Sequence, residues 1–294
     1  MVRLEKRAVG GKTCYYFSHT YRLGGKVRYK ETYIGENVPK NLDKIRNEFL
    51  HEIYKEKWFG QLNIIKRAYS KEQRKTPASA REKNLEAFAI RFTYDTNRIE
   101  GSKLTLFETA ALLEHGISPK NKPIRYVKEA ESHQKVFYEM LDYKSDLSLG
   151  TVLKWHKDLF SETKPDMAGK IRPYMVYITN SAFIPPPPNE LPSRLSTLFQ
   201  WYSEVKSELN PVEMAGLLHL KFETIHPFGD GNGRVGRLLM NFVLHKNGYP
   251  MFDIRYEDRR GYYRALERVQ TKGEDGIFLQ WFFKKYIKDN KGYL

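Results

Sequence analysis

Residues 226–237 read His-Pro-Phe-Gly-Asp-Gly-Asn-Gly-Arg-Val-Gly-Arg and join two apolar, helix-like stretches. Proline disfavours helical conformation in the residue before it, so the first helix is expected to end at His226. The glycine-rich turn then leads into a second helix, which Asn232 can cap. We therefore expect a histidine at the end of one helix to face the N-terminus of the next.

This turn has the composition of an anion-binding site. Glycine-rich backbone that enters a helix presents N–H groups and the positive end of the helix dipole, which together bind phosphate. Arg234 and Arg237 are three residues apart, so both can reach phosphate oxygens from one helix face. Asp230 offers the oxygen ligand that Mg²⁺ prefers, and His226 can accept a proton near neutral pH. The pattern predicts phosphoryl or nucleotidyl transfer.

Three other interpretations fit the stretch less well. A Walker-type phosphate loop needs Gly-Lys-Ser/Thr, which does not follow. A calcium loop beginning at Asp230 would place Arg234 where an oxygen ligand is required. A diiron bundle would use the two Glu-x-x-His motifs that end at His51 and His226, and the proline directly after His226 argues against it.

Composition indicates a folded, globular protein. Apolar residues make up 40% and charged residues 29% of the chain, and no apolar run approaches the ~20 residues that span a bilayer. We expect a cytoplasmic protein that does not bind membranes. Cys14 is the only cysteine, so oxygen or imidazole must hold any metal. The net charge of +15 attracts anions from nucleotides to nucleic acids.

Two kinds of periodicity divide the chain. Residues 1–38 predict a small basic β-meander, because paired glycines separate aromatic and β-branched runs. Residues 39–78 predict a helical linker region and residues 79–294 a helical bundle. Helices of the bundle are expected at about residues 83–99, 105–115, 124–143, 149–160, 192–207, 211–225, 232–247, 257–271 and 275–289.

One β-like segment interrupts the helices. Met175 to Ile178 is followed by Asn180-Ser181 and then by the proline run 185–188. This order predicts a short hairpin that ends in a polyproline connector. The predicted fold is therefore mainly α, a helical bundle with a β-hairpin, preceded by the N-terminal β-meander.

The twelve residues from His226 to Arg237 resemble the full signature of the Fic family, His-x-Phe-x-(Asp/Glu)-Gly-Asn-Gly-Arg-x-x-Arg, without a departure. The resemblance extends from about Ser79 to the C-terminus. It implies a Fic-fold bundle with a hairpin flap, and a protein adenylyltransferase that moves AMP from ATP to a Tyr, Ser or Thr hydroxyl. The acceptor would be a target protein or the chain itself. Such an enzyme would use Mg²⁺, and similar proteins are often homodimers.

The resemblance also implies a task for each residue of the site. His226 would activate the hydroxyl, and Asp230 would hold Mg²⁺ on the α- and β-phosphates. The other residues fall into three groups: phosphate binding by Gly231, Asn232, Gly233, Arg234 and Arg237; an adenine pocket of Tyr263, Leu266 and Gln270; and a target-binding flap of Met175, Val176, Tyr177 and Ile178. Gln270 stands where relatives often carry asparagine, which leaves the choice of nucleotide open.

A second motif lies just before residue 101. Thr96-Asn-Arg-Ile-Glu-Gly101 resembles the inhibitory motif of one Fic class, Ser/Thr-x-x-x-Glu-Gly/Asn, here on a helix of about residues 83–101. Glu100 would pair with Arg237 in the place of the γ-phosphate, so that ATP binds misaligned. In some relatives this glutamate also aligns water for de-AMPylation. The alternative is a surface glutamate that ends a helix before a glycine cap.

Two further alternatives stay open. The Fic core could be a nucleotide-sensing scaffold whose basic N-terminal module binds nucleic acid or a partner protein, although its aromatic residues more often form the core of a small sheet. The donor could also differ, because other members of the family transfer UMP or phosphocholine, or phosphorylate their targets.

Overall fold

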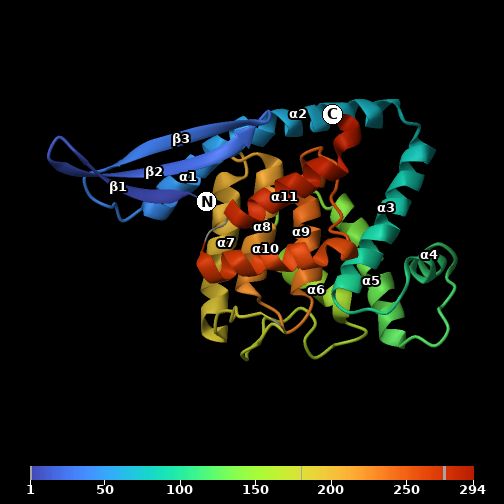
Figure 1. Ribbon diagram of the computed structural model, residues 1–294. Coiled ribbons are helices and arrows are strands. Elements are labelled where there is room, and N and C mark those ends of the chain that lie inside the picture. Colours follow the sequence, from blue (N-terminus) through green and yellow to red (C-terminus); the bar gives the residue numbers. More distant parts are fainter. Residues whose placement is uncertain (1, 180, 274–275) are drawn as a thin grey trace. The chain divides into compact units, whose positions relative to one another are not determined.

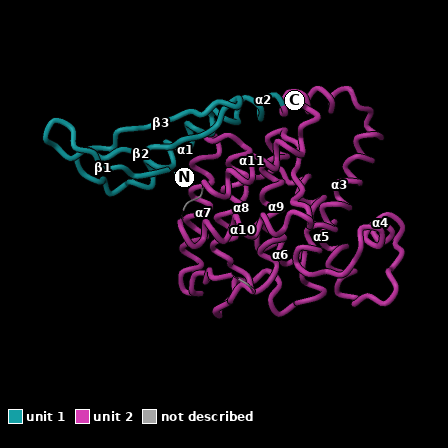
Figure 2. Tube along the Cα trace, viewed as in Figure 1, with its two compact units in different colours: residues 1–64, 294 teal, residues 65–293 magenta. Residues whose placement is uncertain are grey.

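The computed structural model describes residues 2–179, 181–273 and 276–294. Two compact units divide the chain, one of residues 1–64 with residue 294 and one of residues 65–293 (Figure 2). The boundary falls inside helix α2 (Gly60–Lys75), so the meander and the first helix share a unit. Within the described residues, no helix is both long enough and apolar enough to cross a membrane.

The N-terminal unit contains the predicted antiparallel meander (Figure 1). Its strands are hydrogen-bonded in chain order. The Gly10-Gly11 and Gly24-Gly25 pairs connect them, and all four glycines have positive φ, as two-residue hairpin turns require. The strands are β1 (Arg3–Val9), β2 (Lys12–Leu23) and β3 (Lys26–Gly35).

One helix covers a face of this sheet. Phe17 and Tyr21 of β2 form a buried cluster with Phe49 and Ile53 of α1 (Leu42–Tyr54). These two aromatics are therefore core residues, as is usual in a small sheet. α1 continues through a π-helical turn, Lys55–Phe59, into α2.

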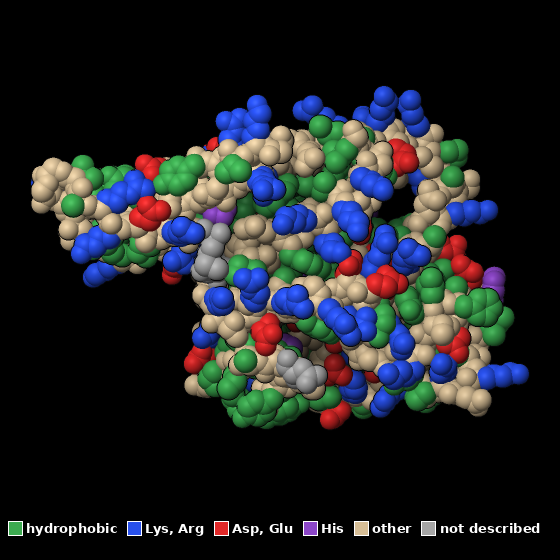
Figure 3. Space-filling model, in the orientation of Figure 1, with side chains coloured by type: hydrophobic (Ala, Val, Ile, Leu, Met, Phe, Trp, Pro, Cys, Tyr) green, Lys and Arg blue, Asp and Glu red, His purple; other side chains and the backbone are tan. Residues whose placement is uncertain are grey.

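Some of the basic residues of the meander are paired with carboxylates. Arg7 contacts the carboxylates of Glu5 and Glu31, and Lys30 contacts that of Glu56. Elsewhere on the face drawn in Figure 3, Lys and Arg side chains are scattered among other types and do not gather in one patch. The net positive charge thus does not by itself mark a binding surface on this face.

The larger unit is the predicted helical bundle, and every predicted helix is present. α3 begins earlier than predicted, at Ala78, and residue 275 of the last predicted helix lies outside the described residues. The helices are α3 (Ala78–Ile99), α4 (Leu106–His115), α5 (Ile124–Asp142), α6 (Leu149–Phe160), α7 (Leu191–Val205), α8 (Pro211–Ile225), α9 (Asn232–Lys246), α10 (Arg259–Lys272) and α11 (Gly276–Asp289).

Helices α8 and α9 form the centre of the bundle, and α10 and α11 pass in front of them in Figure 1. Every residue of α9 from Asn232 to Leu244 is buried. Gly216 of α8 permits close packing, because a Cβ there would lie only 2.9 Å from the ring of Phe282 in α11. The turn between α8 and α9 is therefore held by two buried helices.

The predicted hairpin at Met175 to Ile178 is wrong for the described residues. Exposed and partly buried side chains alternate along this segment, but none of its residues is in a strand. The Ser181 N–H bonds to the Ile178 carbonyl at 3.2 Å, and Asn180, at the predicted turn, lies outside the described residues. A returning strand would run into the prolines at 185–188, which lack N–H donors for a ladder. The segment is an extended loop.

Candidate active site

His226 occupies the C-cap of α8 in the left-handed conformation, with φ 51° and ψ 58°. Its N–H still bonds to the Phe222 carbonyl at 3.0 Å. A non-glycine residue in this conformation costs of order 1–3 kcal/mol, so the surrounding structure must impose it. Pro227 prevents the helix from continuing and turns the chain toward α9.

Arg172 supplies part of that constraint. Its side chain is 2% exposed, and its Nε donates to the His226 carbonyl at 2.9 Å. The same guanidinium bonds to the carbonyls of Tyr174 and Pro186, at 2.7 and 2.6 Å, on either side of the extended loop. One buried arginine therefore ties the base of the predicted flap to the histidine.

The environment of His226 favours a neutral imidazole. Burial lowers the pKa of His226, while the Glu223 carbonyl and the Glu100 carboxylate exert smaller effects in the opposite direction. A neutral ring at pH 7 can accept a proton, which is the property required of a general base.

The turn after His226 is closed by Asn232. Its Oδ1 accepts from the Phe228 N–H and its Nδ2 donates to the Phe228 carbonyl, both at 2.9 Å. The side chain thus holds the turn together. Phosphate would therefore be bound here by the backbone N–H groups of the first turn of α9, which have no partner within their helix, and not by the Asn232 side chain.

His156 of α6 packs against the turn and bonds to it. Its ring stacks on Phe228 at 3.7 Å between centroids, its Nε2 lies 2.9 Å from the Asp230 carbonyl, and the Gly169 N–H donates to its Nδ1 at 2.9 Å. Because Nδ1 accepts, the ring proton resides on Nε2 and is donated to Asp230. Burial lowers the pKa of His156 to about 4, which keeps this tautomer neutral.

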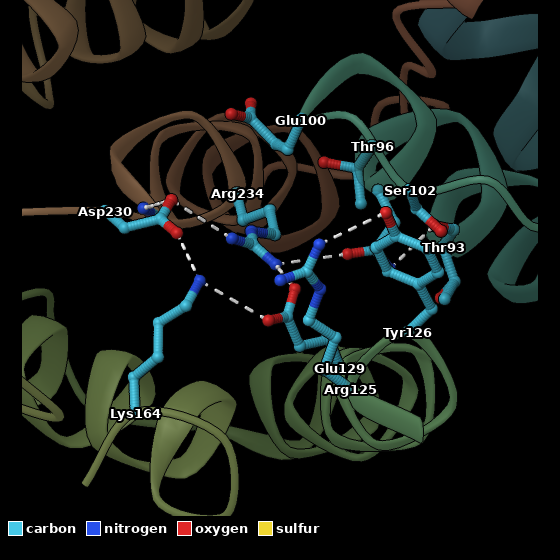
Figure 4. Close-up of polar contacts among 12 residues, drawn as sticks. Thr93, Thr96, Glu100, Ser102, Arg125, Tyr126, Glu129, Lys164, Asp230 and Arg234 are labelled. Carbon is cyan, nitrogen blue, oxygen red and sulfur yellow. Dashed lines mark hydrogen bonds and ion pairs between the residues drawn. The ribbon is translucent and has the colours of Figure 1, made fainter. Parts of the chain in front are cut away.

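Asp230 begins a group of charged side chains around the turn (Figure 4). Its carboxylate contacts Lys164 and lies 3.2 Å from Arg234, which also contacts Glu129. Burial tends to raise the pKa of Asp230, but Arg234 and Lys164 outweigh it and hold that pKa below its ordinary value. Asp230 is therefore ionised at neutral pH.

The residues present fit a magnesium site of the kind that nucleotides complete. In the described part of the chain, no three His, Cys, Asp or Glu side chains gather as a metal site. Proteins usually bind Mg²⁺ through one or two carboxylates, and phosphates and water supply the other ligands. The ionised carboxylate of Asp230 is sufficient for such a site.

Arg237 is 1% exposed and pairs with Glu100. Its Nε donates to the Thr96 hydroxyl at 2.6 Å. Burial alone would lower the pKa of Arg237, but the opposing effects of its neighbours, the largest of them from the Glu100 carboxylate, together raise it. A Cβ on Gly233 would collide with Glu100 Oε1, so the carboxylate lies directly on the first turn of α9, where an anion is favoured.

A second carboxyl lies deeper in the same region. Glu223 is 7% exposed, and burial raises its pKa to about 8, against the opposing effect of Arg237. His219, one turn earlier on α8, is fully buried and its Nε2 lies 2.8 Å from the Tyr262 hydroxyl. At neutral pH Glu223 is therefore largely protonated.

The three predicted adenine-pocket residues lie on α10. Tyr263 donates to the Ile99 carbonyl at 3.2 Å, and Gln270 donates to the Glu223 carbonyl at 3.5 Å. Leu266 is 5% exposed. The helix thus brings Tyr263 to the end of α3 and Gln270 to the end of α8.

Comparison with known proteins agrees with this geometry. Residues 146–244, from just before α6 through most of α9, match the Fic/DOC family. The chain contains a Fic domain. The Fic-domain chain is 32% identical to "Protein adenylyltransferase Fic" of Nematostella vectensis over 60% of this chain and 42% of the relative. It is 34% identical to the Drosophila melanogaster protein of that name over 64% of this chain and 38% of the relative.

Solved structures give the same Fic fold. A Fic domain containing signaling protein from Bacteroides thetaiotaomicron, 29% identical, covers 78% of this chain and 96% of its own with a TM-score of 0.68. Fic-1 from C. elegans, 24% identical, covers 86% of this chain and 74% of its own with a TM-score of 0.70. The chain spans about two fifths of the length of the curated relatives it matches.

Sequence reasoning missed several residues that shape this Fic site. His156, Lys164 and Glu129 belong to no motif, and each contacts a residue of the signature that lies more than sixty residues away in the chain. Arg172 belongs to none of the predicted groups of site residues, and its role is visible only in its contacts. No local signal in the sequence indicated these contacts.

Proposed function

We propose that this chain is a protein adenylyltransferase, which transfers AMP from ATP to a hydroxyl side chain of a target protein or of itself. The observation that carries the proposal is the placement of His226, with a lowered pKa, at the end of α8 directly before the anion-binding start of α9. The names of the relatives support it, as does the ionised Asp230 within the same turn.

The mechanism assigns one step to each group. His226 accepts the proton of the attacking hydroxyl, whose oxygen forms a bond to the α-phosphorus. The bond from that phosphorus to the bridging oxygen breaks, and pyrophosphate leaves with the electron pair. Arg234, Arg237 and the N–H groups of the first turn of α9 stabilise phosphate charge. Asp230 would hold Mg²⁺, which would supply positive charge beside the phosphates.

Glu100 acts as a brake in this proposal. Its carboxylate takes both the guanidinium of Arg237 and the space above Gly233, which are the places a γ-phosphate would use. ATP that cannot reach them binds with its α-phosphate out of line for attack. The proposal includes the reverse duty, in which Glu100 aligns water to hydrolyse an AMP–protein bond.

Incubation with ATP labelled at the α-phosphate, in Mg²⁺, tests the proposal. We expect strong labelling of the Glu100→Gly protein itself, little labelling of the wild type, and none when His226→Ala is added. Label that survives His226→Ala would refute the transferase. Equal labelling of wild type and Glu100→Gly would refute the inhibitory role of Glu100 and leave the transferase proposal standing.

The remaining features belong to the same proposal. Tyr263, Leu266 and Gln270 enclose the base, and competition among the four nucleoside triphosphates tests that pocket. Met175 to Ile178 receives an extended segment of the target by backbone pairing, as edge strands do. Self-modification would be favoured in a homodimer, which light scattering would detect. A cytoplasmic location stays a prediction.

The scaffold alternative, in which the N-terminal module binds nucleic acid, gains no specific observation. Phe17 and Tyr21 are used in packing against α1, and Arg7 is paired with two carboxylates. A salt-dependent mobility shift with DNA that disappears on deleting residues 1–38 would reinstate it.

A further inference from the structure

Lys164 lies in the turn that follows α6, and its backbone is firmly held. Its N–H bonds to the Phe160 carbonyl at 2.8 Å, and its carbonyl accepts from Met167 and Ala168 at 3.1 and 3.0 Å. The ammonium lies 5.1 Å from the centre of the Phe160 ring. The turn therefore directs this side chain across a buried aromatic ring toward Asp230.

Lys164 and Arg234 close a ring of four charges with two carboxylates (Figure 4). The Lys164 ammonium contacts Asp230 Oδ2 and lies 3.4 Å from Glu129 Oε1. Arg234 lies 3.2 Å from Asp230 Oδ1 and contacts Glu129 Oε2. All four carboxylate oxygens are engaged, and both oxygens that Asp230 could offer a metal already face a cation.

The two cations of this ring differ in how readily they can leave it. The Lys164 side chain is 27% exposed and the Arg234 side chain 3% exposed. An ammonium is strongly hydrated and sits on a flexible stem, whereas a buried guanidinium would lose several bonds at once. Lys164 is the partner of Asp230 that can move into water.

We propose that Lys164 is a competing cation that a divalent metal must displace from Asp230. The lysine then sets the Mg²⁺ concentration at which the site loads, and it keeps Asp230 paired when nucleotide is absent. This inference rests on the proposed role of Asp230 as the metal ligand. It adds a residue outside the signature that tunes metal dependence through a direct contact.

The test measures binding, not turnover. A fluorescent, non-hydrolysable ATP analogue is titrated by anisotropy, first in EDTA and then at increasing MgCl₂, with every protein carrying Glu100→Gly. Lys164→Met is expected to lower the Mg²⁺ concentration for half-maximal gain in affinity by about fivefold, the upper range for breaking a partly exposed ion pair. Lys164→Arg keeps the competing charge and should stay near the parent protein.

Lys170→Met is the matched control, because Lys170 lies in the same turn region but donates to the Asp166 carbonyl at 3.0 Å. An unchanged Mg²⁺ midpoint in Lys164→Met would overturn the inference, as would an equal change in Lys170→Met. Weaker analogue binding by Lys164→Met in EDTA and Mg²⁺ alike would make Lys164 a phosphate ligand instead. Asp230→Asn should lose the Mg²⁺ gain; if it does not, the proposed metal ligand is wrong, whatever Lys164 does.

Discussion

Removing the Glu100 carboxylate should make the protein less stable and, at the same time, more responsive to ATP. Breaking a buried ion pair by deleting one partner costs about 3–5 kcal/mol. Glu100 is 23% exposed, and Thr96 retains its contacts with Arg237, so a loss of about 2 kcal/mol is the appropriate scale after solvent screening. For a unit of this size, that lowers Tm by about 6 °C.

The same change exposes a cation that nucleotide can satisfy. ATP at about 100 times its Kd adds about 2.7 kcal/mol to the stability of the protein that binds it. We therefore expect Glu100→Gln to have the lower Tm without nucleotide and the larger upward shift with ATP and Mg²⁺. Differential scanning fluorimetry measures both, with Glu82→Gln as control, because Glu82 is an exposed residue of the same helix. An unchanged Tm together with an unchanged ATP shift would refute the reasoning.

Three further predictions concern pH. Burial raises the pKa of Glu223 to about 8 from 4.5, so the folded protein binds this proton more tightly and its stability falls from pH 4.5 to 8. Glu223→Gln should therefore be more stable than the wild type by about 4 kcal/mol at pH 8, as urea unfolding measures, while Glu208→Gln should not. His133 and His156 bind protons more readily in the unfolded protein, because burial lowers their pKa values to about 3 and 4 in the folded one. Each should therefore lower the free energy of unfolding by about 2 kcal/mol as the pH falls from 6.5 to 5. Denaturant midpoints that stay constant over that interval would contradict this. The rate of labelling by Glu100→Gly should be constant from pH 7 to 9 and should decline only below the ordinary pKa of histidine, because burial lowers the pKa of His226. A midpoint above pH 7 in the labelling rate would argue against His226 as the base.

The parts of the fold that follow local rules were predictable from the sequence. Helical periodicity located each helix of the bundle, and the paired glycines located the turns of the meander. The signature also placed a histidine at a helix end, because proline forbids the helix from continuing. The prediction of a hairpin flap was wrong for a reason that is also local, because the prolines at 185–188 remove the N–H donors that a second strand would need.

What the sequence did not reveal depends on distant partners. Asn232 is a reasonable cap by type, but its side chain bonds to Phe228 and does not cap α9. Glu129 and Arg234 are separated by 105 residues, so only the packing of α5 against α9 brings them together. Periodicity identifies a helix face, but it does not say which charge on that face meets which other charge.

These distant partners share one property. Each charged group expected to meet ATP and Mg²⁺ already meets an opposite charge within the chain: Arg237 meets Glu100, Arg234 meets Glu129, and Asp230 meets Lys164. Loading the site is then an exchange of internal partners for phosphate and metal, with both sets of charges satisfied. An exchange of this kind makes net affinity small and sensitive to single charges. A variant without Glu100 should favour the nucleotide, and one without Lys164 should favour the metal.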